Sequence, residues 1–163
     1  MDQYRERMLQ LEAAWTSLGS ASARERDVWA DSVGDLLEQP YLAQADAERL
    51  VGWLVQLAVS DHDDAVRESA LHAVAAAGAP YELPFAVVEP LAVHIDGFKP
   101  VVLEYVLSSL SATHDDRARP VIEPFLTHAD ADVRAEADMA IRLACFVRMP
   151  SSAWRRSQAE GSA

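Results

Sequence analysis

The chain has 163 residues, of which half are hydrophobic and a quarter are charged, and its 26 acidic and 14 basic side chains give a net charge of −12. The apolar content is sufficient for the core of one folded domain and excludes a disordered acidic tail. The negative charge excludes a surface suited to nucleic acid or anionic membranes, and it either favours a basic partner or serves solubility alone.

The sequence also bears on cellular location. The first residues, MDQYRERMLQLEAAW, carry charges where a signal peptide needs an apolar core. No apolar run approaches the ~18 residues of a membrane span. The lone cysteine, Cys145, excludes an intrachain disulfide, and we expect it to be a buried small hydrophobe. These features predict a cytoplasmic protein.

Amphipathic helices account for most of the chain. Apolar residues recur at steps of three or four, the spacing of one helix face, as in Tyr4, Met8, Leu11, Trp15 and Leu18. Ser22 and Glu25 form a capping box before the second helix, and Gly78 and Pro80 end the fourth. In order, the predicted helices cover residues 2–18, 23–39, 43–59, 63–77, 83–93, 98–112, 118–127 and 131–147.

Prolines are expected to modify two of these helices. Pro84 suits the first turn of the fifth helix, where a missing N–H is harmless. Pro90 lies deeper in the same helix and predicts a break or kink. Pro120 and Pro124 predict that the seventh helix is short.

Two stretches are similar to each other: DDAVRESALHAVAAA at residues 63–77 and DADVRAEADMAIRLA at residues 130–144. Their separation is two steps of the length that helical solenoid repeats use. Asp96 falls 33 residues after Asp63 and 34 before Asp130, which indicates a middle copy that has Pro100 near the place of the arginine. The first helix pair lacks the Val-Arg signature, as expected of a terminal cap.

The pattern Asp-x-x-Val-Arg-x-x-Ala, preceded by a Leu-rich helix, resembles a HEAT repeat. One copy has Leu54, Leu57, Asp63, Val66, Arg67 and Ala70, and the other has Val121, Phe125, Asp130, Val133, Arg134 and Ala137. The resemblance implies that the aspartate caps the turn, that the arginine bonds to a neighbouring repeat, and that the second helix of each pair lines the concave side.

We therefore expect an all-α fold, an α-solenoid of about four antiparallel helix pairs in a right-handed superhelical stack. Residues 1–149 form one domain, and residues 150–163 form a flexible tail. Trp154 in this tail, beside two arginines, either docks on the last repeat or anchors a partner.

Catalytic chemistry is not predicted. His62, His94, His114 and His128 each stand near an aspartate, as in metal-dependent hydrolases. At solenoid turns such residues lie roughly 10 Å apart and do not converge on one ion, so no metal site is expected. Six scattered glycines make no phosphate-binding loop, no strand–helix elbow exposes a serine, and no cofactor is expected.

The outward positions of the second helices are mostly acidic, and we predict that they bind a protein partner with a basic surface. The predicted contacts are Asp27, Asp31, Asp35, Glu68, His72, Glu104, Ser108, Glu136 and Asp138. A small acidic protein of this kind resembles bacterial immunity proteins, which block a cognate toxin. The alternatives are a scaffold or assembly factor like HEAT-like lyase subunits, and a metal-dependent hydrolase that uses the His-Asp turns.

Overall fold

A computed structural model describes residues 2–146, and the surroundings of side chains from Arg5 to Ala144. The predicted tail with Trp154 and the side chain of Cys145 lie outside this part. Its helices are α1 (Asp2–Ser17), α2 (Ala23–Leu37), α3 (Gln44–Ser60), α4 (Asp64–Ala77), α5 (Phe85–Val93), α6 (Pro100–Ser111), α7 (Arg119–Ile122) and α8 (Ala131–Phe146). Three short 3-10 helices accompany them: η1 (Leu18–Ser20), η2 (Ile95–Gly97) and η3 (Glu123–Thr127).

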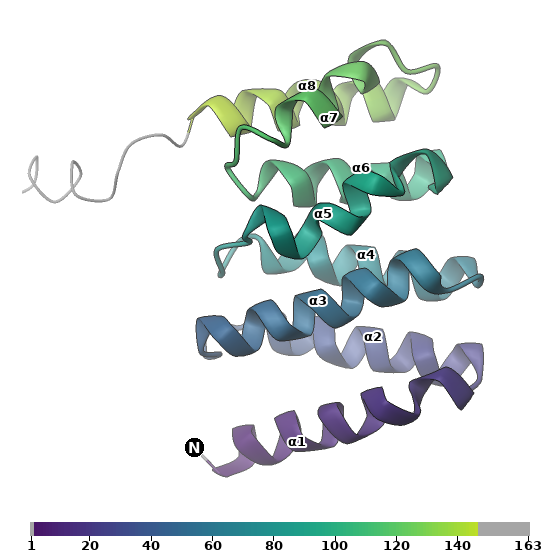
Figure 1. Cartoon of the computed structure of the whole chain (residues 1–163), viewed down its shortest axis with the longest axis vertical. Helices are drawn as coiled ribbons and strands as arrows, with labels where there is room; N and C mark the ends of the chain where they lie inside the picture. Colours follow the sequence, from purple (N-terminus) through teal and green to yellow (C-terminus); the bar gives the residue numbers. More distant parts are fainter. Residues whose placement is uncertain (1, 147–163) are drawn as a thin grey trace, which may run out of the picture.

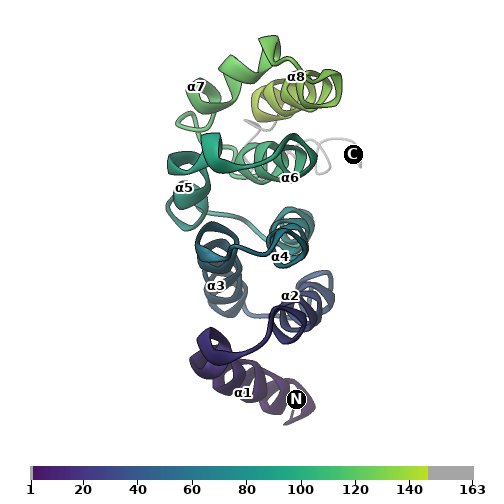
Figure 2. The same cartoon turned by 90° about the vertical axis from the view of Figure 1, so that its right-hand side faces the viewer.

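The helices stack in two layers, and the chain crosses from one layer to the other at each turn (Figures 1 and 2). One layer consists of α1, α3, α5 and α7. The other, which we call the second-helix layer, consists of α2, α4, α6 and α8, and each of these packs on the next. Within residues 2–146 there is no β-strand, so the predicted all-α solenoid is confirmed.

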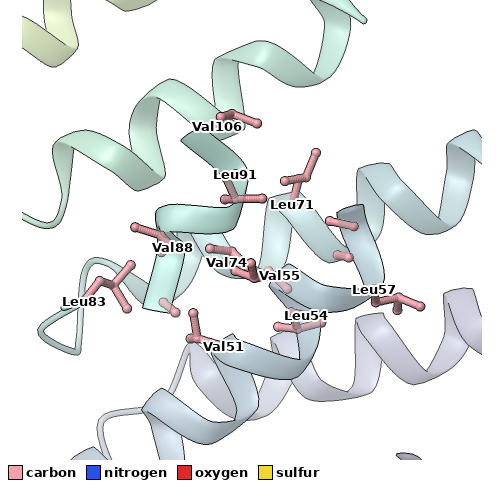
Figure 3. Close-up of a cluster of buried hydrophobic side chains, with 14 of the residues drawn as sticks. Val51, Leu54, Val55, Leu57, Leu71, Val74, Leu83, Val88, Leu91 and Val106 are labelled. Carbon is pink, nitrogen blue, oxygen red and sulfur yellow. The ribbon is translucent and has the colours of Figure 1, made fainter. Parts of the chain in front are cut away.

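The core runs continuously between the layers. Figure 3 shows Val51, Leu54 and Val55 of α3 beside Leu71 of α4 and Leu91 of α5, all fully or almost fully buried. Side chains from successive repeats thus share one apolar interior. No repeat has a core of its own, so each depends on its neighbours for burial.

The structure tests the expectations about two prolines. Pro84 lies just before the first turn of α5 and not within it, and its extended backbone (φ −60°, ψ 135°) starts the helix. Of the break or kink expected at Pro90, the break is absent, because α5 continues to Val93. The Pro90 carbonyl then accepts a hydrogen bond from the His94 amide, at 3.1 Å, where the helix ends. The predicted short seventh helix is confirmed, since α7 gives way to η3 after one turn.

The two repeat aspartates cap their helices as the HEAT resemblance implied. Asp63 Oδ1 accepts hydrogen bonds from the amides of Ala65 and Val66, at 3.0 and 3.3 Å. Asp130 does the same at the start of α8. Asp96 does not occupy this position: it lies in η2, and the residue that precedes α6 is Lys99, followed by Pro100. The even spacing of the three aspartates therefore does not mark equivalent sites.

At the fourth residue after the helix cap, an arginine joins successive repeats in two of the three cases. Arg134 is the exception, because it donates to the carbonyls of His128 and Ala129 in the turn before its own helix. Arg67 donates to the Ala58 carbonyl and to the Gly97 carbonyl of the next repeat, both at 3.2 Å. Arg26 occupies the same position in α2, although the first pair lacks the Val-Arg signature, since Glu25 precedes this arginine. It makes a bidentate pair with Asp61, at 2.5 and 3.0 Å, in which the Asp61 side chain is only 4% exposed.

Helix α1 is held by large side chains. The rings of Trp15 and Trp53 stack with centroids 5.5 Å apart, and Trp29 tilts against Trp15 at 5.3 Å. Trp29 Nε1 donates to the Leu11 carbonyl at 3.3 Å. These tryptophans pack between repeats, as expected, and they connect α1, α2 and α3.

Glycines set the spacing of the second-helix layer. A Cβ on Gly78 would lie 2.7 Å from the Ala112 Cβ, and one on Gly34 would lie 3.1 Å from the Ala73 Cβ. Gly78 has an ordinary helical φ of −65°, so it ends α4 without the left-handed conformation typical of a helix-ending glycine. Gly78 is therefore needed because the end of α6 comes close to it, and not because its backbone adopts a conformation that only glycine allows.

We expect Gly78→Ala to lower the free energy of unfolding by about 1–3 kcal/mol, because the new methyl overpacks the α4–α6 contact. The double variant G78A/A112G should recover most of the loss in urea denaturation. Gly52→Ala is the control: nothing lies within 4 Å of its added Cβ, and it should stabilise α3 by about 0.5–1 kcal/mol. A fully stable G78A would contradict the close approach.

We expect Arg26→Met to lower the free energy of unfolding by about 3 kcal/mol at pH 7, because it leaves the buried Asp61 carboxylate without its cationic partner. Burial acts to raise the pKa of Asp61, but hydrogen bonds from Arg26 and the Asp63 amide outweigh it and the pKa is lowered. The stabilisation is therefore present above pH 3.8 and is lost as the pH falls, so the deficit of the variant should shrink in acid. Arg142→Met, which removes an exposed pair with Asp138, should cost less than about 1 kcal/mol throughout.

Candidate functional site

The candidate site is the outward side of the second-helix layer, which we call the second-helix face. Each of its helices buries one stripe and leaves the opposite side open. The structure places eight of the nine predicted residues on this face: Asp27, Asp31 and Asp35 on α2, Glu68 and His72 on α4, Glu104 and Ser108 on α6, and Glu136 on α8.

Neighbouring helices meet along this face through the predicted side chains. Ser69 Oγ donates to Asp27 Oδ1 at 2.6 Å, which joins α4 to α2. The rings of His72 and Tyr105 meet edge to face at 5.4 Å, which joins α4 to α6. The residues on three helices therefore form one connected surface.

A shallow depression of about 350 Å³ lies where α2, α4 and α6 meet. Three carboxylates line it, from Asp27, Asp31 and Glu68, and no Lys or Arg belongs to its lining. Asp31 and Glu68 make no hydrogen bond or ion pair with another residue in the described part of the chain. Tyr105 adds an aromatic ring at the α6 side. Carboxylates beside an aromatic ring suit an ammonium or guanidinium group.

A second acidic pair continues the face toward α8. Burial raises the pKa of Glu136, and the negative charge of Glu104 on α6 raises it further. Neither carboxylate has a cationic partner among residues 2–146. The two groups therefore repel each other in the free protein, and a cation placed between them would relieve that repulsion.

Asp138 does not belong to this surface. It stands two residues after Glu136, which places it about 160° away around the helix. There it makes an exposed ion pair with Arg142, at 2.7 Å. The sequence prediction assigned it to the acidic row because it treated neighbouring acidic positions of one helix as a single side.

The prediction also missed the apolar part of the face. Val28, Val101, Met139 and Leu143 are between 50% and 61% exposed, although they are large hydrophobic side chains of the second helices. Tyr105 is half-buried beside His72. The sequence did contain a signal for these residues, because each falls at a helix position that does not line up with the buried apolar stripe of its helix. A face that mixes carboxylates with exposed apolar side chains is typical of protein interfaces.

The His-Asp turns do not gather into a centre. His62, His94 and His114 are exposed at separate turns, and His128 Nδ1 accepts a hydrogen bond from the Asp130 amide at 3.1 Å. In the part of the chain that the structure describes, no three His, Cys, Asp or Glu side chains are placed to hold a metal ion. None of the described helices is long and apolar enough to cross a membrane.

Comparisons with known proteins bear on the fold. No protein-family model matches the sequence, and no curated protein does. The structure is similar to a designed armadillo repeat protein solved in complex with the peptide (KR)4, at 15% identity and a TM-score of 0.62 over 82% of this chain. It is also similar to an engineered protein, at 16% identity and a TM-score of 0.60.

These matches cover 63% and 62% of the two other chains, so this chain spans less than two thirds of their length. At such low identity the likeness concerns the arrangement of helices alone.

The pKa of Glu136 leads to a stability prediction. Because that pKa is raised in the folded state, ionisation of Glu136 destabilises the fold, and the penalty sets in as the pH rises above 4.5. Glu136→Gln should therefore raise the melting temperature at pH 7 and have no effect at pH 3. Asp132→Asn, an exposed change one turn earlier, is the control. An equal shift at both pH values would contradict the raised pKa of Glu136 in the folded state.

The helical stack, the capping aspartates and the matched structures agree. The chain has the fold of a HEAT/armadillo-type repeat solenoid.

Proposed function

We propose that the chain is a non-enzymatic protein-binding module whose second-helix face holds a partner with a basic surface. The depression between α2, α4 and α6 carries the proposal, because three carboxylates line it without a basic side chain. A Lys or Arg side chain of the partner would enter there, against the Tyr105 ring. Further contacts would come from Glu104 and Glu136.

The position of the acidic groups supports a role in binding. Asp35 lies in the last turn of α2, at the negative end of the helix dipole, where a carboxylate costs about 0.3–1 kcal/mol. Glu104 and Glu136 repel each other across two helices. Solubility alone needs no such placement, since exposed carboxylates elsewhere would serve it equally. A cationic partner would offset these costs only when it is bound.

The matched structures support the proposal at the level of the scaffold. One of them is a designed armadillo repeat protein in complex with a peptide of alternating lysine and arginine. A stack of helix pairs is therefore able to present a face to a basic segment. The residues that would do so in this chain are its own.

More specifically, we propose that the chain is an immunity-type protein whose acidic face occludes the basic substrate-binding surface of a toxin. The net charge of −12 supports fast association with such a surface. Protection of cells that express the toxin would separate this role from that of a scaffold or assembly factor, which should give no protection.

We expect the quadruple change of Asp31, Glu68, Glu104 and Glu136 to Lys to weaken binding of a fluorescent (Lys-Arg)4 peptide at least 10-fold in anisotropy titrations. The same variant should lose the natural partner in pull-down from native lysate. Salt should weaken wild-type binding, because the contacts are largely exposed.

The matched control changes four exposed acidic residues outside the second-helix face to Lys, with an equal change in net charge: Glu6, Glu82, Glu89 and Asp96. It should lose much less affinity, through net charge alone. Equal losses in the two variants would mean that overall charge, and not this face, is responsible. Undiminished binding by the first variant would refute the proposal.

A further inference from the structure

A cleft of about 410 Å³ lies at one edge of the stack, apart from the second-helix face. Most of its lining comes from the ends of α1 and α3 and from the turns that follow them, which lie on the same edge in Figure 1. None of the nine predicted contact residues belongs to this lining. Its volume is in the range of clefts that bind ligands, so the cleft is a second candidate site.

One wall of the cleft is apolar and aromatic. Leu18 and Leu57 line it with only 6% and 5% of their surface exposed, and Trp15 lines it half-buried. The ring centroids of Trp29 and Trp53 are 5.3 and 5.5 Å from that of Trp15, and 6.5 Å from each other. Both rings therefore lie toward the same side of Trp15, and its other side is left for the cleft.

The most buried polar groups of the cleft neutralise each other. The Asp61 side chain is 4% exposed, and both of its oxygens accept hydrogen bonds from Arg26. Arg26 Nη1 also donates to the Ala21 carbonyl, at 2.6 Å. Among the described residues, no other Asp, Glu, Lys or Arg lines the cleft. An ionic ligand would therefore be desolvated here without a counter-charge of its own.

Neutral hydrogen-bonding groups stand at the opening of the cleft. Gln56, Ser60 and His62 are exposed residues of its lining. The Ser60 hydroxyl donates to the Gln56 carbonyl at 2.8 Å, which leaves the hydroxyl oxygen free to accept. The side chains of Gln56 and His62 make no hydrogen bond with another residue in the described part of the chain. A hydroxyl group at the opening therefore finds both donors and acceptors.

We infer that this cleft binds a neutral aromatic ring with one hydrogen-bonding group, in the form of a tyrosine side chain of a partner protein. The ring packs on Trp15 and Leu57, and the phenol hydroxyl pairs with Gln56 or His62. Tyrosine suits the cleft because it has an apolar body and one polar tip, and because pairs of aromatic rings add to the energy of burial. Such aromatic anchors are common at protein interfaces.

The site is tested by NMR titration of the ¹⁵N-labelled full chain with 4-methylphenol, the analogue of the tyrosine side chain. We expect saturable shifts of the Trp15 indole N–H, the Gly19 amide and the Gln56 side-chain amide, and none at Glu68 or His72 of the acidic depression. The non-aromatic match, 4-methylcyclohexanol, should bind about 5-fold more weakly. Equal binding of the two probes, or no saturable shift at tens of millimolar, would overturn the inference.

Charged probes test whether the cleft prefers a neutral ligand. Benzoate and benzylamine keep the aromatic ring but carry a negative and a positive charge at neutral pH. Both should bind more weakly than 4-methylphenol, because the buried pair of Arg26 and Asp61 offers no free counter-charge. Tighter binding of either one would overturn the assignment of a neutral ligand.

Variants at the edge of the cleft show where the probe binds. Gly19→Leu should abolish the saturable shifts, and it is tolerated because a Cβ at Gly19 meets nothing within 4 Å. Gly97→Leu is the matched control, also in a 3-10 helix and with open space at its Cβ, and should bind as the wild type does. Gln56→Ala, a change at an exposed position, should weaken binding about 2- to 5-fold. Unchanged affinity in both cleft variants, or an equal loss in Gly97→Leu, would overturn the site.

A peptide separates a partner's side chain from a free phenolic molecule. A capped pentapeptide with one central tyrosine between glycines should displace 4-methylphenol and bind at least as tightly. Weaker binding of the peptide would overturn the assignment to a partner protein. Saturation with 4-methylphenol should leave the affinity for the fluorescent (Lys-Arg)4 peptide unchanged, because the two sites share no lining residue. Failure of the acidic face and failure of this cleft are therefore distinguishable.

Discussion

Close packing within the second-helix layer is the constraint on which the candidate site depends. Small residues allow it: Gly34 faces Ala73 between α2 and α4, and Gly78 faces Ala112 between α4 and α6. Helices this close bring side chains of neighbouring repeats into contact on the outward side. The hydrogen bond from Ser69 to Asp27 is a direct result. A larger residue at Gly34 would separate α2 from α4, and with them the carboxylates that now share one depression.

The second-helix face gathers carboxylates from neighbouring helices. Several other acidic groups have a local structural role: Asp63 and Asp130 cap helices, and Asp61 pairs with Arg26. On the face, Asp31, Glu68 and the Glu104–Glu136 pair remain without a cationic partner in the described part of the chain. Stability contributed by the continuous core compensates for this repulsion, and the repulsion in turn leaves a surface that gains most from a cation.

Local signals in the sequence were sufficient for the helices and their caps. The capping box at Ser22 and the aspartate at position 63 appear in the structure where the pattern placed them. Contacts between distant residues were less accessible: Arg26 and Asp61 are 35 residues apart, so nothing in the local pattern marks them as partners. The regular spacing of Asp96 was misleading because η2 precedes α6, so that the helix starts only at Pro100.

The site was predictable where helix geometry alone determines which side a residue faces. Glu68 and His72 are four residues apart and share a side, whereas Asp138 and Glu136 are two apart and do not. Tyr105 was missed because its place beside His72 depends on how α6 lies against α4. Exposed Val28 and Met139 were missed because a hydrophobic residue in a helix is by default assigned to the core.

The positions of the tryptophans determine which part of the protein is monitored when unfolding is followed by fluorescence. Trp15, Trp29 and Trp53 form one cluster in the first three helices, and the sequence has four tryptophans in all. Intrinsic fluorescence is therefore weighted toward one end of the stack, whereas far-ultraviolet circular dichroism averages over every helix. In a linear array whose repeats contact only their neighbours, the two spectroscopic signals follow different parts of the molecule. A difference between the unfolding midpoints of the two signals would measure how far the array departs from two-state unfolding.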